Sequence, residues 1–179
     1  NSLSSTQLAG LTSGQVQNLS SNQLNALTSV KLQALETGDV KALSSTQIQS
    51  LSSTQLNSLS TNQVKALSID QMRALSATQL NSLSTTTVQA LESTQINALT
   101  STQVGGLTAA GVFNKLSTAQ VAVLSSDVLR AAATSAIQGI STTQLNALGS
   151  SQIQALTSSQ VQALSSAQLN AVATTQIAS

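Results

Sequence analysis

Five scattered carboxylates are the chain's candidates for general acid and base chemistry: Glu36, Asp39, Asp70, Glu92 and Asp127. Glu36 and Asp39 are the closest pair, and their spacing fits the N-cap and third residue of a helix, where carboxylates complement the helix dipole. Serine hydroxyls are abundant, but a serine nucleophile needs a base, and the chain contains no histidine. These residue types favour structural roles, and we expect no catalytic site and no enzyme.

The composition argues against most other kinds of site. The 179 residues include no His, Cys, Pro, Trp or Tyr, and the net charge is +1, so we expect no metal, cofactor, small-molecule substrate or nucleic-acid partner. Only 6% of the residues are charged, against about 25% in typical domains. Asp70 with Arg73 and Asp127 with Arg130 have the spacing of surface helix ion pairs. Apolar runs are too short for a membrane span.

An eight-residue repeat runs through the whole chain. Leucine recurs at every eighth residue from Leu3 to Leu107, and the register resumes at Leu116 after one inserted residue. We number the positions of each octad from 0 to 7, with this leucine at position 0. The 22 octads predict a single continuous repeat domain over residues 1–179.

The octad carries the signature of a helix start. Position 1 is Ser or Thr in 17 octads, position 4 is Gln in 16, and position 5 is apolar in all 22. A hydroxyl at the N-cap and Gln three residues later form a capping box, and the apolar residues on either side form a hydrophobic staple. The capping residues of the most regular stretch are Ser52, Gln55, Ser60, Gln63, Ser68 and Gln71.

These signals predict an all-α repeat solenoid with one short capped helix in each octad. A single continuous helix is disfavoured, because eight residues at about 100° each rotate the apolar face by about 80° per octad. A β-solenoid remains the alternative, although positions 0 and 5 would fall on opposite faces of a strand. The predicted core residues of the regular stretch are Leu51, Leu56, Leu59, Val64, Leu67, Met72, Leu75 and Leu80.

A second period indicates how the octads stack. Position 5 is β-branched in every third octad: Val16, Val40, Val64, Val88, Val112, Ile137 and Val161. This 24-residue period predicts three octads per coil and about seven coils. With stacked helices about 8 to 10 Å apart, the rod would be about 60 to 70 Å long. A coil of two octads remains an alternative.

Residues 104–139 depart most from the consensus. They include Gly105 and Gly106, the inserted residue near Phe113, and Ala132 in the leucine position. Two interpretations stay open: a tolerated defect in the array, or a kink or contact point at which Phe113 covers a neighbour.

Neither end of the array carries a polar capping repeat, which solenoids ordinarily need because their terminal coils otherwise expose the core. Contact between unlike ends of identical chains is a heterologous interface, and it generates filaments when it does not close a ring. We therefore expect head-to-tail self-association, or else continuation of the array in a longer parent protein. The candidate self-association residues are Leu3, Leu8, Phe113, Val172 and Ile177.

The pattern resembles the tandem L-[ST]-x-x-Q-[VIL]-x-A octapeptide arrays of large bacterial secreted and surface proteins, which are often adhesin-like. Residues 43–67 and 140–171 carry this pattern. The resemblance implies an extracellular or cell-surface location, which suits a neutral surface of Ser, Thr, Asn and Gln. The expected function is structural, either as a filament subunit or as the rod-like spacer of an adhesin. The alternative is ice or surface binding through a regular Ser and Thr array.

Overall fold

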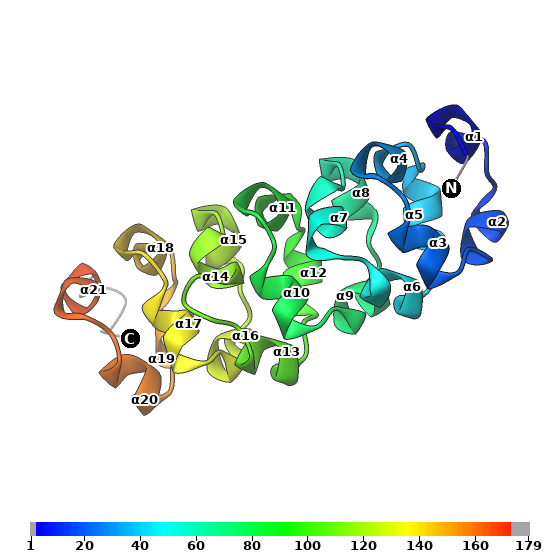
Figure 1. Ribbon diagram of the computed structural model, residues 1–179. Helices are drawn as coiled ribbons and strands as arrows, with labels where there is room; N and C mark the ends of the chain where they lie inside the picture. The colour runs from blue at the N-terminus through cyan, green and yellow to red at the C-terminus, as the bar shows by residue number, and fades with distance from the viewer. Residues whose placement is uncertain (1–2, 173–179) are drawn as a thin grey trace.

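The computed structural model describes residues 3–172, and every regular element in this part of the chain is a helix of four to six residues. The helices follow a superhelical path, so the molecule is a rod with α1 (Ser5–Ala9) and α21 (Ser166–Ala171) at opposite ends (Figure 1). The predicted all-α solenoid is confirmed. The β-solenoid alternative is wrong, since residues 3–172 contain no strand. None of the described helices has the length and apolar character needed to cross a membrane.

Three columns of stacked helices run along the rod. Column A contains α1, α4 (Ser29–Gln33), α7 (Ser53–Ser58), α10 (Ala77–Asn81), α13 (Ser101–Gly105), α16 (Ser126–Ala131) and α19 (Ser150–Gln154). Column B contains α2 (Ser13–Gln17), α5 (Thr37–Ala42), α8 (Thr61–Ala66), α11 (Thr85–Ala90), α14 (Val112–Lys115), α17 (Thr134–Gln138) and α20 (Ser158–Gln162). Column C contains α3 (Ser21–Asn25), α6 (Ser45–Ser50), α9 (Ile69–Ala74), α12 (Ser93–Asn97), α15 (Thr118–Ala122), α18 (Thr142–Asn146) and α21.

Packing within a column joins each helix to the one three places later in the sequence. In column B, for example, α2 packs on α5 and α5 packs on α8. Because each octad forms one helix, one coil of the solenoid contains three octads, as the 24-residue period predicts. The two-octad alternative is therefore wrong.

A capping box starts most of the helices, as α7 illustrates. Ser52 has an extended backbone, with φ −68° and ψ 157°. Its Oγ accepts from the Gln55 backbone N–H at 3.2 Å, and Gln55 Oε1 accepts from the Ser52 N–H at 3.1 Å. The helix ends at Ser58 because Leu59 leaves the helical region, with φ −58° and ψ 136°. Isolated helices shorter than about 12 residues are marginal, so packing between coils must stabilise these helices.

Positions 0 and 5 of the octads fill the interior of the rod. From Leu8 to Leu145, every residue at position 5 is at most 2% exposed, and the leucines at position 0 are buried from Leu27 to Leu124. The core residues predicted for the regular stretch are all buried: Leu51, Leu56, Leu59, Val64, Leu67, Met72, Leu75 and Leu80. Together these side chains form one continuous apolar cluster along the solenoid.

The irregular residues 104–139 preserve the column order through close approaches at glycine. No described glycine has a positive φ, so these positions need space rather than a special backbone conformation. A Cβ at Gly106 would lie 2.7 Å from the Ala77 Cβ, and a Cβ at Gly139 would meet the backbone of Ala109. Phe113 in α14 is 2% exposed, so its ring packs inside the core.

Candidate functional site: hydrogen-bond ladders between coils

The glutamine at position 4 caps the start of its own helix and also forms hydrogen bonds with the preceding coil. In α9, Gln71 is 2% exposed, and its Oε1 accepts from the backbone N–H of the N-cap Ser68 at 2.7 Å. Its Nε2 donates to the backbone carbonyls of Val40 at 2.8 Å and Leu43 at 2.6 Å. These carbonyls lie at the C-terminal end of α5, where a helix leaves carbonyls without intrahelical partners. One side chain therefore caps two helices that belong to different coils.

The same bond recurs along the rod, and we call this series the glutamine ladder. In most members, Nε2 donates to carbonyls 28 and 31 residues earlier, as in Gln95 to Leu67 at 2.8 Å and Val64 at 2.9 Å. The donors among residues 3–172 are Gln47, Gln55, Gln63, Gln71, Gln79, Gln95, Gln103, Gln120, Gln144, Gln152, Gln160 and Gln168.

The glutamine ladder explains a preference that capping leaves unexplained. Glu serves as well as Gln in a capping box, yet no octad has Glu at position 4. A carboxylate accepts hydrogen bonds but has no N–H to donate. The absence of Glu at position 4 was therefore a signal in the sequence that the glutamine Nε2 donates a hydrogen bond. The argument from capping did not use this signal.

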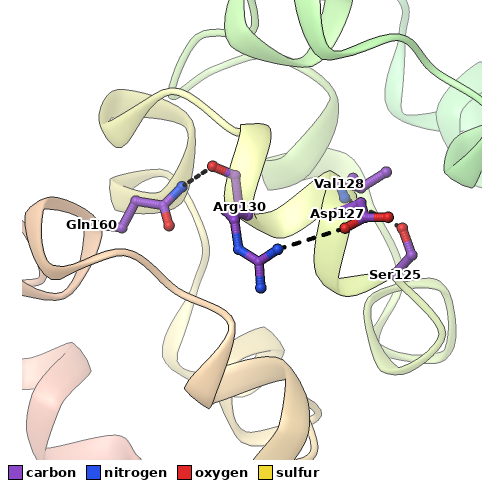
Figure 2. Close-up of polar contacts among 5 residues, drawn as sticks. All are labelled: Ser125, Asp127, Val128, Arg130 and Gln160. Carbon is purple, nitrogen blue, oxygen red and sulfur yellow. Dashed lines mark hydrogen bonds and ion pairs between the residues drawn. The ribbon is translucent and has the colours of Figure 1, made fainter.

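Figure 2 shows the glutamine ladder where α20 meets α16. The Nε2 of Gln160 lies 3.5 Å from the Arg130 carbonyl and makes shorter bonds, of 2.7 and 2.8 Å, to two neighbouring carbonyls. At the start of α16, the Val128 N–H donates to Ser125 Oγ at 3.3 Å. Arg130 Nη1 also lies 3.7 Å from Asp127 Oδ1, but both side chains are exposed, so this ion pair contributes little. The backbone of Arg130 thus matters more to the rod than its charge.

A second series of bonds runs from position 6 toward the following coil. Asn81 Nδ2 donates to the Gly106 carbonyl at 3.0 Å, and Asn97 Nδ2 donates to the Val123 carbonyl at 2.8 Å. Corresponding bonds are made by Gln33, Asn57, Arg73, Gln89 and Gln138. We call this series the position-6 ladder. The sequence had suggested an ion pair between Arg73 and Asp70, whereas Arg73 Nε donates to a backbone carbonyl at 3.0 Å.

Position 6 also compensates for octads that lack glutamine at position 4. In α11 that position is Thr87, and the N–H of the N-cap Ser84 donates instead to Asn57 Oδ1, at 2.7 Å. Two further pairs do the same, namely Thr108 N–H with Asn81 Oδ1 at 3.0 Å and Ser125 N–H with Asn97 Oδ1 at 2.8 Å. The position-4 residues of these two octads are Gly111 and Val128. An asparagine of the preceding coil therefore replaces the acceptor that the octad itself does not supply.

Lys115 replaces the missing donor beside the inserted residue. Its Nζ donates to the carbonyls of Asn81 at 3.1 Å and Leu83 at 2.6 Å. These carbonyls lie 30 and 28 residues before Gly111, where a glutamine of this octad would bind. In this octad, Asn81 therefore accepts the hydrogen bond of the cap N–H, and Lys115 donates the hydrogen bonds to the preceding coil.

Asp39 occupies the glutamine position of α5 and is 4% exposed. Its Oδ2 accepts from the Glu36 N–H at 3.3 Å, and its Oδ1 accepts from the Ser13 hydroxyl at 2.9 Å. Across this boundary the preceding coil therefore donates the hydrogen bond through Ser13, whereas a ladder glutamine would donate to the preceding coil. The closest acid pair of the sequence is therefore a helix start.

The predicted capping residues all take part in helix starts. Ser52, Ser60 and Ser68 each accept from the backbone N–H three residues later. The matching side-chain acceptors for the cap N–H groups are Gln55, Gln63 and Gln71. Their donor role toward the preceding coil was not predicted.

The predicted self-association residues separate into three groups. Leu8 and Phe113 are 0% and 2% exposed, so the expectation of a surface role is corrected for both: each packs inside the core. Leu3 and Val172 are half-buried, at the two ends of the described chain. Ile177 lies outside the described residues.

An apolar groove opens at the C-terminal end of the described rod. Its volume is about 340 Å³, and it is lined by Ile153, Gln154, Leu156, Val161, Leu164, Leu169 and Val172. Val161 is 39% and Leu169 47% exposed, although both occupy position 5. Position 5 is buried from Leu8 to Leu145, so these two side chains differ from the equivalent residues of the inner coils.

Comparison with known proteins bears on the repeat itself. Residues 32–69 and 72–109 each match the family model of the ALTTAQ repeat. None of the curated proteins and none of the solved structures that were compared matches the chain. The chain is therefore a tandem-repeat protein that carries two stretches similar to the ALTTAQ repeat.

Proposed function

We propose that the protein is a non-catalytic structural rod of a bacterial cell surface, either a filament subunit or a spacer that holds an adhesive domain away from the cell. The glutamine ladder carries this proposal. It joins each coil to the preceding one from Gln47 to Gln168, and ten of its twelve glutamines are buried. Because the most regular polar side chains of the protein form hydrogen bonds between its own coils, the protein is suited to a mechanical role.

Two directions of bonding support a stiff rod. The glutamine ladder connects each coil to the one before it, and the position-6 ladder connects it to the one after it. In solenoids, stability is approximately a sum of repeat and neighbour terms. Because the boundaries have a packed core and glutamine-ladder bonds, and several have position-6 bonds as well, we expect the rod to resist bending and local opening.

The surface composition supports a location outside the cell. Six Lys and Arg residues in 179 leave few sites for trypsin-like proteases, and the exposed positions carry mainly Ser, Thr, Asn and Gln. The resemblance to adhesin-like octapeptide arrays points to the same location. Antibodies raised against the rod should label intact cells of its source, and labelling only after the cells are opened would contradict this part of the proposal.

Small-angle X-ray scattering of the purified chain at high dilution tests the rod. We expect the pair-distance distribution of an elongated particle with a maximum dimension of about 60 to 70 Å, from about seven coils spaced by 8 to 10 Å. Added salt should leave this dimension unchanged, since exposed charges contribute little to it. A symmetric distribution with a much shorter maximum dimension would show that the chain is not a rod.

Binding to ice or another regular surface is a second candidate, and one observation favours it. Column A presents exposed threonines at position 3 with a 24-residue spacing, at Thr54, Thr78 and Thr102. The same column has Thr6 at one end and Val30, 67% exposed, between Thr6 and Thr54. A thermal hysteresis measurement at millimolar protein tests this function, and Thr78→Lys should abolish any activity found. Absence of hysteresis removes this candidate.

A further inference from the structure

One corner of the solenoid lacks the side-chain hydrogen bonds that join successive coils elsewhere. A corner is the bend between two successive helices, and it packs on the corner three helices earlier, because each helix packs on the helix three places before it. A side chain forms a hydrogen bond across this boundary at every corner from α4–α5 to α20–α21 except one. The exception is the α16–α17 corner, which packs on the α13–α14 corner.

The contact at this corner consists of packing alone. Residues 128–136 and residues 104–109 all lie in the part of the chain that the structure describes, and no hydrogen bond joins the two segments. The helices themselves are in contact, α16 with α13 and α17 with α14. Two features of the sequence explain why the hydrogen bonds are missing.

The glutamine ladder is interrupted here because position 4 of α17 is Ala136, which is 0% exposed and has no amide. In three other octads, an asparagine at position 6 of the preceding coil replaces the missing glutamine. The residue at the corresponding place is Gly105, which precedes the N-cap Ala133 by 28 residues. Asn97 precedes its N-cap partner Ser125 by the same interval. Glycine has no side chain, so the compensation found in the other octads is absent from this one.

The start of α17 lacks further stabilising contributions. Its N-cap is Ala133, which has no hydroxyl to accept a backbone N–H, and the Ala133 N–H itself donates no hydrogen bond within the described chain. Losing an N-cap side chain and leaving an N–H without an acceptor both destabilise a helix start. Position 0 of this octad is Ala132 rather than leucine, and the smaller side chain buries less apolar area. The α16–α17 corner is therefore weaker than its neighbours in capping, in hydrogen bonding and in apolar burial.

From these coincident losses we infer that the α16–α17 corner is a built-in opening point, at which the rod opens before it opens at any other corner from α4–α5 to α20–α21. The free energy of local opening varies along a protein and is lowest where few contacts must break. On one side, Gln103 bonds α13 to the coil before it, and on the other, Gln160 bonds α20 to the end of α16. Tension or thermal motion therefore opens this boundary while the ladder holds the coils on either side. This opening depends on the fold of the rod and not on its location or its mechanical role.

Two arginine residues allow the opening to be measured with trypsin. Arg73 and Arg130 are both exposed, each at position 6 of a six-residue helix, and each is followed by alanine. Figure 2 shows Arg130 on α16. Trypsin cleaves after arginine where the backbone opens, and the cleavage rate follows the population of the open form when reclosing is fast. In the 179-residue chain, cleavage after Arg130 should be at least about tenfold faster than cleavage after Arg73, as measured by mass spectrometry of the first fragments.

Gly105→Asn should stabilise the closed form of this corner. A Cβ at Gly105 would lie 3.6 Å from the Ala131 carbonyl oxygen, an ordinary contact, so the position has room for a side chain. One octad earlier, Asn97 binds the carbonyl 26 residues later and the N-cap N–H 28 residues later. The new amide should likewise bind the Ala131 carbonyl and the Ala133 N–H, and it should slow cleavage after Arg130 by about tenfold.

Gly105→Ala is the matched control, because it adds the Cβ and restricts the backbone but supplies no amide. Cleavage after Arg130 should be at least about threefold slower in Gly105→Asn than in Gly105→Ala, although alanine is the better helix former. Cleavage after Arg73 should be the same in both variants, so the bond between Arg73 and the Ala98 carbonyl does not affect this comparison. Circular dichroism must show the wild-type helix content in each variant. If Gly105→Asn fails to fold, Ala133→Ser, which restores the cap hydroxyl, should slow the same cleavage.

Hydrogen exchange gives a second measurement, without a protease. Ile137, Val121 and Leu145 are equivalent residues at position 5, all are 0% exposed, and the amide of each donates to the carbonyl of its N-cap. After correction for intrinsic exchange rates, the Ile137 amide should exchange at least about tenfold faster than the other two amides.

Three results would overturn the opening point. The first is equal exchange of these three amides, and the second is equal cleavage after Arg73 and Arg130 in the wild-type chain. The third is equal cleavage after Arg130 in Gly105→Asn and Gly105→Ala, because the missing hydrogen bonds would then not be the cause of opening. Small-angle scattering tests the rod separately, whichever result is found.

Discussion

The hydroxyl of Thr87 donates to Asn57 Oδ1 at 3.1 Å, across a boundary between coils that separates the two residues by 30 positions. Asn57 Oδ1 also accepts from the Ser84 N–H at 2.7 Å. Asn57 therefore supplies an acceptor that Gln supplies elsewhere, and it does so for an octad in which position 4 is Thr. Residues at position 6 of one coil and position 4 of the next are thus energetically linked.

Replacing Asn57→Ala should destabilise the rod by about 1 to 3 kcal/mol, because it leaves the Ser84 N–H without its acceptor. Asn25→Ala is the matched control, since Asn25 is exposed at the same octad position and the corresponding Ser52 N–H is satisfied by Gln55. The control should change stability by less than about 0.5 kcal/mol. Urea unfolding followed by circular dichroism measures both. Adding Thr87→Gln to Asn57→Ala should restore stability, and failure to do so argues against the link.

Gln71→Glu separates the two roles of the ladder glutamine. The variant retains an acceptor for the Ser68 N–H but sets a buried carboxylate against the Val40 and Leu43 carbonyls. We expect a loss of about 3 kcal/mol or more at pH 7, because the charged oxygen has no donor there. Gln7→Glu, at an exposed ladder position, should be neutral within about 0.5 kcal/mol.

The same variant should depend on pH in a defined direction. Burial favours the protonated carboxyl, so the native state of Gln71→Glu binds the proton more tightly than the unfolded state does. Its destabilisation should therefore shrink as the pH falls toward about 4, where most of the carboxyl is protonated in both states. Thermal unfolding at pH 4 and pH 7 gives the comparison, and an equal loss at both values would mean that packing rather than charge is responsible.

Lys115→Met should destabilise the irregular coil by about 1.5 to 3 kcal/mol, the range for hydrogen bonds to charged groups. The methionine preserves most of the apolar stem but removes the ammonium that binds the Asn81 and Leu83 carbonyls. Lys41→Met is the control, because Lys41 is exposed. Hydrogen exchange should show faster opening around residues 107–116 only in the first variant, and uniform protection in both would exclude a local role for Lys115.

Gly139→Ala should cost about 1 to 3 kcal/mol, because the new Cβ would overlap the backbone of Ala109, which cannot move without shifting the adjoining coil. Gly14→Ala has no atom within 4 Å of its new Cβ and lies inside a helix, so it should stabilise by about 0.5 to 1 kcal/mol. Opposite signs in thermal unfolding support the close-packing argument. A neutral Gly139→Ala would show that this boundary has room.

Much of the fold could be predicted from the sequence because its determinants are local. The capping residues Ser52 and Gln55 act within one turn, and the burial of Leu51 and Leu56 follows from their octad positions. The 24-residue period in position 5 predicted three octads per coil, and the packing of each helix on the one three places later excluded the two-octad alternative. The expectations for Leu8 and Phe113 failed because exposure depends on the coil packed above a residue, which its octad position alone does not define.

The sequence by itself determined that each octad starts a helix and buries positions 0 and 5, since both follow from contacts within a few residues. Only the tertiary structure decided which distant carbonyls Gln71 meets, why Asn57 serves Thr87, and where Lys115 replaces a missing amide. These partners lie about 30 residues apart and are brought together by the pitch and turn of the solenoid.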